Sequence, residues 1–233
     1  MRPRERIDVL LHERRNTLAR TALSVAAPRR RRCSTRYLGT EWGGWSVVPE
    51  LLDAESIVYS GGIGTDASFD EALIEQFGCH VHGFDPTPMG RAHGDAVAAR
   101  EPRFHMHAVG LWDQDAVVPF FAPRHPAHDS WSALNLQQTH ESVQLEVRRL
   151  STVMRELGHD RIDLLKIDIE GAEYRVLSDA LDAGMRIPQI AVEFDEPAPT
   201  VTAPARLARR LGAAGYRLVA RDRSEMTFVL DRC

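Results

Sequence analysis

The chain has 233 residues, 43% of them hydrophobic, and a formal net charge of -4. This length suits one α/β domain with a sizeable core, and nothing suggests a second globular domain. The acidic balance beyond the first 36 residues argues against a nucleic-acid groove in the folded part, and no stretch is long and apolar enough to span a membrane.

Residues 1–36 differ in charge from the rest of the chain. They carry 11 of the 29 basic residues, which leaves 18 basic and 30 acidic residues in the remainder. We interpret 1–36 as a basic N-terminal arm or helix and 37–233 as the folded domain. A solvated arm is favoured, and contact with nucleic acid or anionic lipid is the alternative.

The cysteines bear on the compartment. Cys33, Cys79 and Cys233 are odd in number and share no metal-like spacing, so we expect a reduced, cytoplasmic setting. Arg14-Arg15 is similar to the start of a twin-arginine leader, but the apolar run after it is short and ends in Arg29–Arg32. Export is therefore the less favoured interpretation.

The first expected strand covers 56–60, after a turn-rich stretch at 37–45 that is either a lid carrying Trp42 and Trp45 or a separate hydrophobic cluster. A glycine turn follows the strand, and a helix is expected from about residue 66 to Gly78. Glycines at such a turn let backbone amides approach a ligand closely. The cofactor-binding candidates here are Ser60, Gly61, Gly62, Gly64 and Asp66.

The second expected strand, 79–84, ends in Asp85 and Pro86, both cofactor-binding candidates. Asp85 lies 21 residues beyond Gly64, where an acid can accept the two hydroxyls of a ribose. A helix at 89–100 and a third strand at 103–109 follow. Ala108 and Val109, at the end of that strand, are further cofactor-binding candidates, and the next two residues would lie beside an adenine. Asp168, at the end of the central strand, is the last cofactor-binding candidate.

Histidines in and after the third strand are weak metal candidates. His105 and His107 alternate with apolar residues, which is typical of partly buried histidines in a sheet. His125 and His128 lie three residues apart among Pro123 and Pro126, which spoils a helical pair. Residues 114–138 are irregular and are expected to form an acceptor pocket, before a strand at 143–147 and a helix at 151–157.

The stretch 162–177 is expected to form the central strand and the next helix. Its first half is apolar apart from Lys166, as in a parallel strand covered on both faces. The strand gives way to the helix at Asp168 to Gly171. Asp168 and Glu170 therefore lie at the carboxyl end of a strand, where open α/β sheets bind ligands. Two solvated acids in a turn are the structural alternative.

The remaining elements close the sheet. A buried strand is expected at 189–195, a helix at 201–211, and a hairpin from 216–220 and 226–230. Five βα units closed by a hairpin suit a methyltransferase sheet better than a dinucleotide-binding one. Asp66 also disfavours a pyrophosphate at the glycine turn, whereas S-adenosylmethionine has no phosphate and offers an ammonium.

Three stretches carry a resemblance: Val58–Gly64 with Ser68-Phe69-Asp70, Gly83–Pro88, and Leu165–Glu173. Together they resemble the FkbM-type S-adenosylmethionine-dependent methyltransferases. The resemblance implies the class I methyltransferase fold, a Rossmann-like α/β sandwich with a mostly parallel sheet closed by a C-terminal antiparallel hairpin. It also implies O-methylation of a natural-product or saccharide hydroxyl. Ser60 departs from the family, in which many members carry an acid there, and Asp66 is the candidate to replace that contact.

Asp168 is the first candidate for the base that takes the hydroxyl proton, and Glu170 either shares that task or holds the acceptor. Lys166 is expected to pair with Glu193 on the neighbouring strand. A magnesium ion held by Asp168, Glu193 and Asp195 is an alternative.

Two other function classes stay open. They are an NAD-dependent oxidoreductase that uses the same glycine turn, and a non-catalytic adenosyl-binding module. The expected partner is a small-molecule hydroxyl acceptor, without nucleic acid or membrane. Whether the chain forms a homo-oligomer is open.

Overall fold

The structure is a computed structural model of the chain, and it describes residues 26–28, 30–125, 130–194, 202–222 and 224–230. The helix expected in the N-terminal arm, around residues 7–18, lies outside the described residues. Within the described part, no helix has the length and apolar content needed to span a bilayer.

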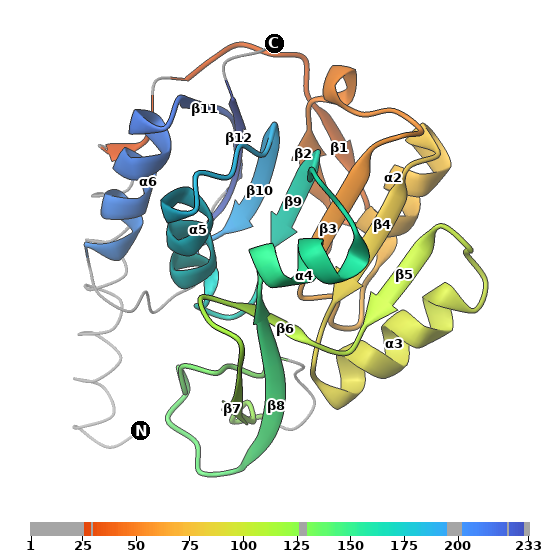
Figure 1. Cartoon of the computed structure of the whole chain (residues 1–233), viewed down its shortest axis with the longest axis vertical. Coiled ribbons are helices and arrows are strands. Elements are labelled where there is room, and N and C mark those ends of the chain that lie inside the picture. The colour runs from red at the N-terminus through yellow and green to blue at the C-terminus, as the bar shows by residue number, and fades with distance from the viewer. Residues whose placement is uncertain (1–25, 29, 126–129, 195–201, 223, 231–233) are drawn as a thin grey trace.

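Seven strands form the central sheet in the order β11-β12-β10-β9-β3-β4-β5 (Figure 1). All run parallel except β12, which is antiparallel to both of its neighbours. This confirms the class I methyltransferase architecture with its closing hairpin. The strands are β3 (Ile57–Gly61), β4 (His80–Phe84), β5 (Phe104–His107), β9 (Leu164–Ile167), β10 (Gln189–Glu193), β11 (Tyr216–Asp222) and β12 (Glu225–Leu230).

Helices cover both faces of this sheet. On one face pack α4 (Leu150–Leu157), α5 (Glu173–Asp182) and α6 (Ala203–Ala213), which lie in front of the sheet in Figure 1. On the other face pack α2 (Ser68–Phe77), α3 (Pro88–Ala98) and the hairpin of β1 (Arg36–Leu38) and β2 (Trp45–Val47). The short helix η1 (Pro49–Leu51) leads from the hairpin into the sheet.

The central strand β9 shows why its sequence is apolar on both sides. Leu164 packs in the core under α2, whereas Leu165 and Ile167 pack in the core under α4 and α5. All four residues of β9 are buried because successive side chains point to opposite faces, and each face carries a helical layer.

A second, three-stranded sheet lies at the carboxyl ends of the parallel strands. It consists of β6 (Gly110–Trp112), β8 (Ser142–Arg149) and β7 (Ala116–Phe121) in the order β6-β8-β7 (Figure 1). The prediction that 114–138 is irregular is wrong for β7, which pairs antiparallel with β8 over six residues. Val118 and Phe120 pack into a small core, so tertiary burial stabilises this strand.

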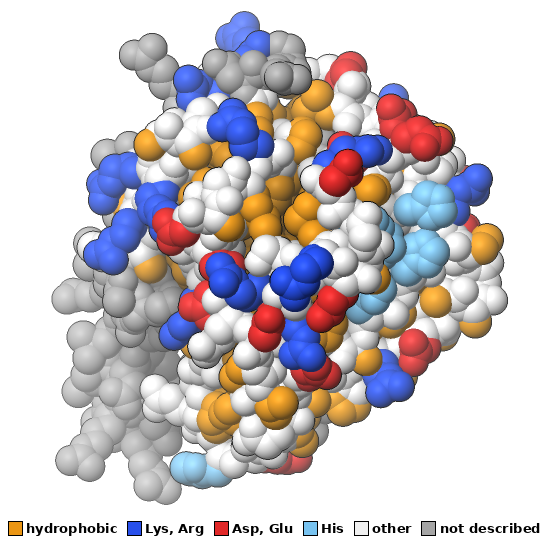
Figure 2. Space-filling view, in the orientation of Figure 1, with side chains coloured by type: hydrophobic (Ala, Val, Ile, Leu, Met, Phe, Trp, Pro, Cys, Tyr) orange, Lys and Arg blue, Asp and Glu red, His pale blue; other side chains and the backbone are white. Residues whose placement is uncertain are grey.

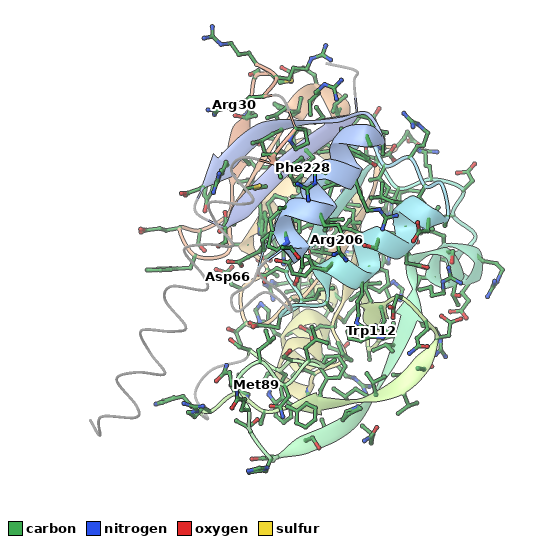
Figure 3. All side chains as sticks on the ribbon, turned by 90° about the vertical axis from the view of Figure 1, so that its left-hand side faces the viewer. Arg30, Asp66, Met89, Trp112, Arg206 and Phe228 are labelled. Carbon is green, nitrogen blue, oxygen red and sulfur yellow. The ribbon has the colours of Figure 1, made fainter. Side chains whose placement is uncertain are left out.

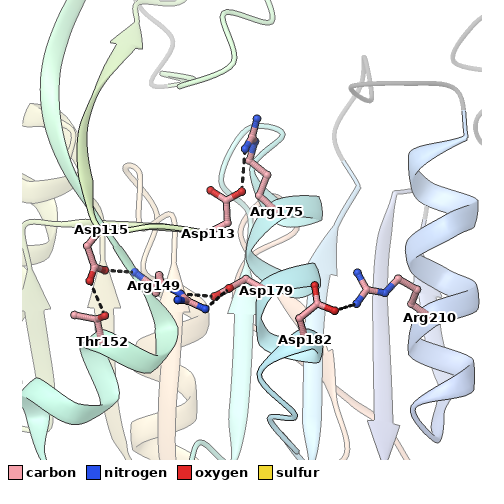
Figure 4. Close-up of polar contacts among 8 residues, drawn as sticks. All are labelled: Asp113, Asp115, Arg149, Thr152, Arg175, Asp179, Asp182 and Arg210. Atoms are coloured by element: carbon pink, nitrogen blue, oxygen red, sulfur yellow. Dashed lines mark hydrogen bonds and ion pairs between the residues drawn. The ribbon is translucent and has the colours of Figure 1, made fainter.

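Ion pairs connect the small sheet to α5 (Figure 4). Arg149, at the end of β8, donates to Asp179 at 2.5 and 3.1 Å, and Arg175 donates to Asp113 at 2.9 Å. The Arg175 guanidinium also lies 5.0 Å from the centre of the Trp112 ring. The small sheet is therefore held over the carboxyl edge of the main sheet.

The last part of the basic arm lies along the edge of the main sheet. Arg30 forms an isolated parallel bridge with Leu218 of β11, and the Arg31 amide donates to the Leu218 carbonyl at 2.9 Å. Figure 3 labels Arg30 at the top of the molecule, close to this end of the sheet. The division at residue 36 between arm and domain stays a prediction.

Candidate active site

A cleft of about 300 Å³ opens where the carboxyl ends of β3, β4 and β9 meet the small sheet. Open α/β sheets bind ligands at this edge. The cleft contains the glycine turn after β3, the acids after β4 and β9, and a set of aromatic side chains. Its aromatic lining residues are Trp42, Trp45, Phe84, Trp112, Phe120 and Trp131.

Most of the sequence-predicted site residues line this cleft, but four do not. Ser60 and Gly61 are buried in β3 beneath the cleft, and Ala108 and Val109 follow β5 outside its lining. The predicted residues that line the cleft are Gly62, Gly64, Asp66, Asp85, Pro86, Asp168 and Glu170.

Gly62 occupies a position that no other residue type would fit. Its φ is +78°, in the left-handed region, and a Cβ there would lie 1.8 Å from the carbonyl oxygen of Asp168. The Asp168 amide donates to the Gly61 carbonyl at 3.1 Å. The glycine turn and the end of β9 are therefore in direct backbone contact.

Asp85 lies at the tip of β4, as predicted, and accepts four hydrogen bonds. One oxygen accepts from the amides of Ile63 (3.1 Å) and Gly64 (3.0 Å), and the other accepts from the amide (2.9 Å) and the hydroxyl (2.7 Å) of Thr87. A carboxylate has about four acceptor sites. Asp85 thus holds the glycine turn to the start of α3, and a ribose would have to replace one of these donors.

Asp66 connects the glycine turn to the loop between β1 and β2. It accepts from the Thr40 hydroxyl at 2.5 Å and from the Ser68 amide at 2.9 Å. Burial alone would raise the pKa of Asp66, but the hydrogen bonds from Ser68 and Thr40 outweigh burial and lower it. Thr40 in turn accepts from the amides of Trp42 and Gly43. The loop that carries Trp42 is therefore held at the mouth of the cleft.

Lys166 does not pair with Glu193, so that prediction is wrong. Its Nζ donates to the carbonyls of Gly61 (3.2 Å) and Gly62 (2.6 Å) and lies 4.0 Å from Asp168. The register explains the difference, because β9 and β10 place Ala191 beside Lys166. The Lys166 ammonium also lies 5.6 Å from the centre of the Trp45 ring. Lys166 therefore holds the glycine turn through hydrogen bonds to its carbonyl oxygens.

Glu193 is instead a neighbour of Asp168. Burial and the Asp168 carboxylate raise the pKa of Glu193 to about 7, while a 2.8 Å hydrogen bond from Ser224 acts in the opposite direction. A neighbouring carboxylate and burial both disfavour the charged form of a carboxyl group. Asp168 therefore has a proton-holding neighbour that lies outside the lining of the cleft.

The loop after β9 is shaped by an acid that the sequence reasoning did not single out. Glu173, fully buried at the start of α5, accepts from the amides of Ile169 (2.7 Å) and Gly171 (3.2 Å). Glu170 between them has a φ of +55°, which is uncommon for a residue with a side chain, and its carbonyl accepts from Ser132 at 2.7 Å. The sequence signal for Glu173 was its position as the third acid of the Asp-Ile-Glu-Gly-Ala-Glu string.

Comparison with known proteins agrees with this geometry. Residues 62–218, well over half of the chain, match the family described as Methyltransferase FkbM domain. The chain belongs to the FkbM methyltransferase family. The matched range begins at the glycine turn and includes the four acids of the cleft, Asp66, Asp85, Asp168 and Glu170.

Relatives of this FkbM-family chain are known at moderate identity. It is 31% identical over 138 residues to 31-O-demethyl-FK506 methyltransferase FkbM of Streptomyces tacrolimicus, which is 59% of this chain and 47% of that protein. It is 28% identical over 137 residues to the probable methyltransferase-like protein 24 of Homo sapiens, covering 59% of this chain and 31% of that protein. The match thus covers less than half of the length of each of these relatives.

Solved structures are more distant. A fibrillarin of Aeropyrum pernix with natively bound S-adenosyl-L-methionine matches 88% of this chain and 86% of its own, with 12% identity and a TM-score of 0.43. Similarity at this level says nothing about a ligand of this chain.

The cleft of this family member fits an S-adenosyl sulfonium better than a metal or a phosphate. Its described lining contains four acidic residues, Asp66, Asp85, Asp168 and Glu170, and one basic residue, Lys166. The magnesium alternative has no support, because no group of three or more His, Cys, Asp or Glu in the described part of the chain is arranged to hold a metal ion. Asp195, its third proposed ligand, lies outside the described residues, as does His128.

Histidines instead form a stacked cluster on β4 and β5, away from the cleft. Nδ1 of His80 lies 3.1 Å from Nε2 of His105, and the same atoms of His82 and His107 are also 3.1 Å apart. Pale-blue side chains gather over these strands on the right of Figure 2. The prediction that His105 and His107 are partly buried sheet histidines is confirmed. His159 joins the cluster from beyond α4.

Proposed function

We propose that the chain transfers the methyl group of S-adenosylmethionine to a hydroxyl of a small natural product or saccharide. The observation that carries this proposal is the convergence of Gly62, Asp85 and Asp168, from three neighbouring strand ends, on one acid-lined and aromatic-lined cleft. Family membership supports methyl transfer. The hydroxyl acceptor rests on the family resemblance and on the presence of carboxylates that can act as bases.

The bound cofactor supplies an electrophilic methyl carbon on a positively charged sulfur. Gly62, Gly64 and Asp85 would hold this group, and its methyl carbon would bond to the acceptor oxygen as the carbon–sulfur bond breaks and leaves its electron pair on sulfur. The protein holds the oxygen in line with that bond, which supplies much of the acceleration. Asp168 takes the hydroxyl proton, and Glu170 orients the acceptor or shares that task.

Lys166 and Glu173 position these groups. Lys166 fixes the Gly61 and Gly62 carbonyls, and Glu173 fixes the amides on both sides of Glu170. A rigid glycine turn and a rigid acid loop keep the distance between cofactor and base constant. We therefore assign both residues positioning roles.

An NAD-dependent oxidoreductase is the competing proposal. The acids of the cleft argue against it, because a pyrophosphate would lie near Asp66 without a free cation among the described lining residues. A thermal-shift comparison of S-adenosylhomocysteine with NAD decides between them. Stabilisation by NAD alone would reject the methyltransferase proposal.

A non-catalytic adenosyl-binding module is the other competitor, and it predicts S-adenosylhomocysteine binding without turnover. Untargeted mass spectrometry of host metabolites, incubated with the protein and S-adenosylmethionine, searches for a product heavier by one methyl. Asp168→Asn should reduce its formation by about 10² or more. Product that forms equally with Asp168→Asn would remove the base assignment.

The setting of the reaction also belongs to the proposal. The reduced state expected for the cysteines is contradicted at Cys33, which is disulfide-bonded, whereas Cys79 is free. A cytoplasmic location, a small-molecule partner and the absence of a nucleic-acid or membrane partner remain predictions from the sequence. The oligomeric state is equally open to measurement by light scattering.

A further inference from the structure

All four tryptophans of the chain line the same cleft, although they come from distant parts of the sequence. Trp42 and Trp45 come from the β1–β2 hairpin, Trp112 ends β6, and Trp131 precedes β8. A chance distribution of four large aromatics would not place them all on one surface. These tryptophans therefore contribute to ligand recognition in the cleft.

These tryptophans differ in what they already contact. Trp45 and Trp112 are 3% and 5% exposed, and their rings lie near Lys166 and Arg175. Trp42 is 81% exposed, and Trp131 is partly exposed. The ring faces of Trp42 and Trp131 are thus the ones that a second molecule in the cleft can cover. An exposed tryptophan costs hydrophobic free energy that binding would recover.

The charge of the cleft is one-sided. Four of the five ionisable groups in its described lining are acids, and the fifth, Lys166, is occupied by two carbonyls and by Asp168. Asp85 is occupied by backbone amides and Thr87. Asp168, the proposed base, lies 4.0 Å from Lys166, and Glu170 follows it two residues later in the cleft lining. Acids outnumber bases by four to one in this lining, so an acceptor that carries a negative charge would find no free cation among the described lining residues.

From these two observations we infer that the acceptor carries a ring with an apolar face, which stacks on Trp42 and Trp131, and bears no negative charge near its reacting hydroxyl. The inference rests on the proposed function and narrows its substrate class. Neutral and cationic ring compounds fit the cleft, whereas phosphorylated and carboxylated ones do not. An amino group on the acceptor would gain from Asp168 and Glu170.

The test uses three probes that differ in one terminal group: tyrosol (neutral), tyramine (cationic) and 4-hydroxyphenylacetate (anionic). Each is titrated, by ligand-observed NMR, into the full chain saturated with S-adenosylhomocysteine. We expect tyrosol and tyramine to bind at least about tenfold more tightly than 4-hydroxyphenylacetate. Tightest binding of the anion, or no binding of any probe to the S-adenosylhomocysteine complex, would overturn the inference.

Two variants separate ring stacking from charge. Trp42→Ala should weaken tyrosol and tyramine by about tenfold and leave S-adenosylhomocysteine affinity unchanged. Glu170→Gln should reduce the difference in affinity between 4-hydroxyphenylacetate and tyrosol. Val117→Ala, at an exposed apolar position on β7 outside the cleft lining, is the matched control. Failure to bind S-adenosylhomocysteine at all would reject the proposed function, which is a separate outcome from failure of the probe series.

Discussion

The backbone of Gly62 lies so close to that of Asp168 that a Cβ on the glycine would be 1.8 Å from the Asp168 carbonyl oxygen. One residue belongs to the proposed cofactor turn and the other is the proposed base. Their contact sets the distance between cofactor and base through backbone atoms, which move less than side chains. It also makes the site sensitive to the smallest possible substitution.

We expect Gly62→Ala to lower the free energy of unfolding and to abolish S-adenosylhomocysteine binding. Gly158→Ala is the control, because Gly158 has a similar φ of +73° with nothing within 4 Å of an added Cβ. The control should cost about 1 kcal/mol from backbone strain, whereas Gly62→Ala should cost roughly 2 kcal/mol more from the clash. Urea unfolding of both variants measures this. Equal losses would show that the contact with Asp168 is not restrictive.

Asp85→Asn should weaken S-adenosylhomocysteine binding by about tenfold, because an amide cannot accept all four hydrogen bonds. Comparing adenosine with 2′-deoxyadenosine then separates the two roles of Asp85. If Asp85 contacts the ribose, removal of the 2′-hydroxyl should weaken binding to the unchanged protein and have little effect on the variant. Thr87→Val removes one competing donor and should preserve adenosine binding. A 2′-hydroxyl effect that is the same in both proteins would limit Asp85 to holding the turn.

Glu193→Gln should raise the free energy of unfolding, relative to the unchanged protein, more at pH 8 than at pH 5. Burial and Asp168 raise the pKa of Glu193 to about 7, above its ordinary value of 4.5. The stability that protonated Glu193 contributes is present below pH 4.5 and is lost as the pH rises through 7. Glutamine cannot ionise, so the variant should gain roughly 1 to 3 kcal/mol relative to the unchanged protein across this range. Glu156→Gln, at an exposed site on α4, should show no such change.

His82→Phe should flatten the loss of stability in acid. Burial and the neighbouring histidines lower the pKa of His82 to about 3, below its ordinary value of 6.5. Stability from neutral His82 is therefore present above pH 6.5 and is lost as the pH falls toward 3. Because phenylalanine does not titrate, the variant should reduce the slope of unfolding free energy against pH by up to about 1.4 kcal/mol per pH unit. Urea unfolding between pH 4.5 and 7 measures the slope, and the exposed His140→Phe should leave it unchanged.

The order of the main elements and the position of the candidate site could be predicted from the sequence. The apolar run at Leu164–Ile167, the glycines after β3 and the acids at the strand ends are local signals, because periodicity and turn chemistry act over a few residues. They placed Gly62, Asp85 and Asp168 at one edge of a parallel sheet, where the cleft lies.

The contacts between side chains could not be predicted in this way and became clear from the three-dimensional structure. The small sheet pairs β6 with β8 across more than thirty residues, and it brings Trp112 and Phe120 over the cleft. Strand register gave Lys166 the Gly62 carbonyl as its partner in place of Glu193, and parallel pairing stacked His80 and His82 on His105 and His107. These contacts depend on the register between strands that are far apart in the chain, and neither composition nor local periodicity carries that information.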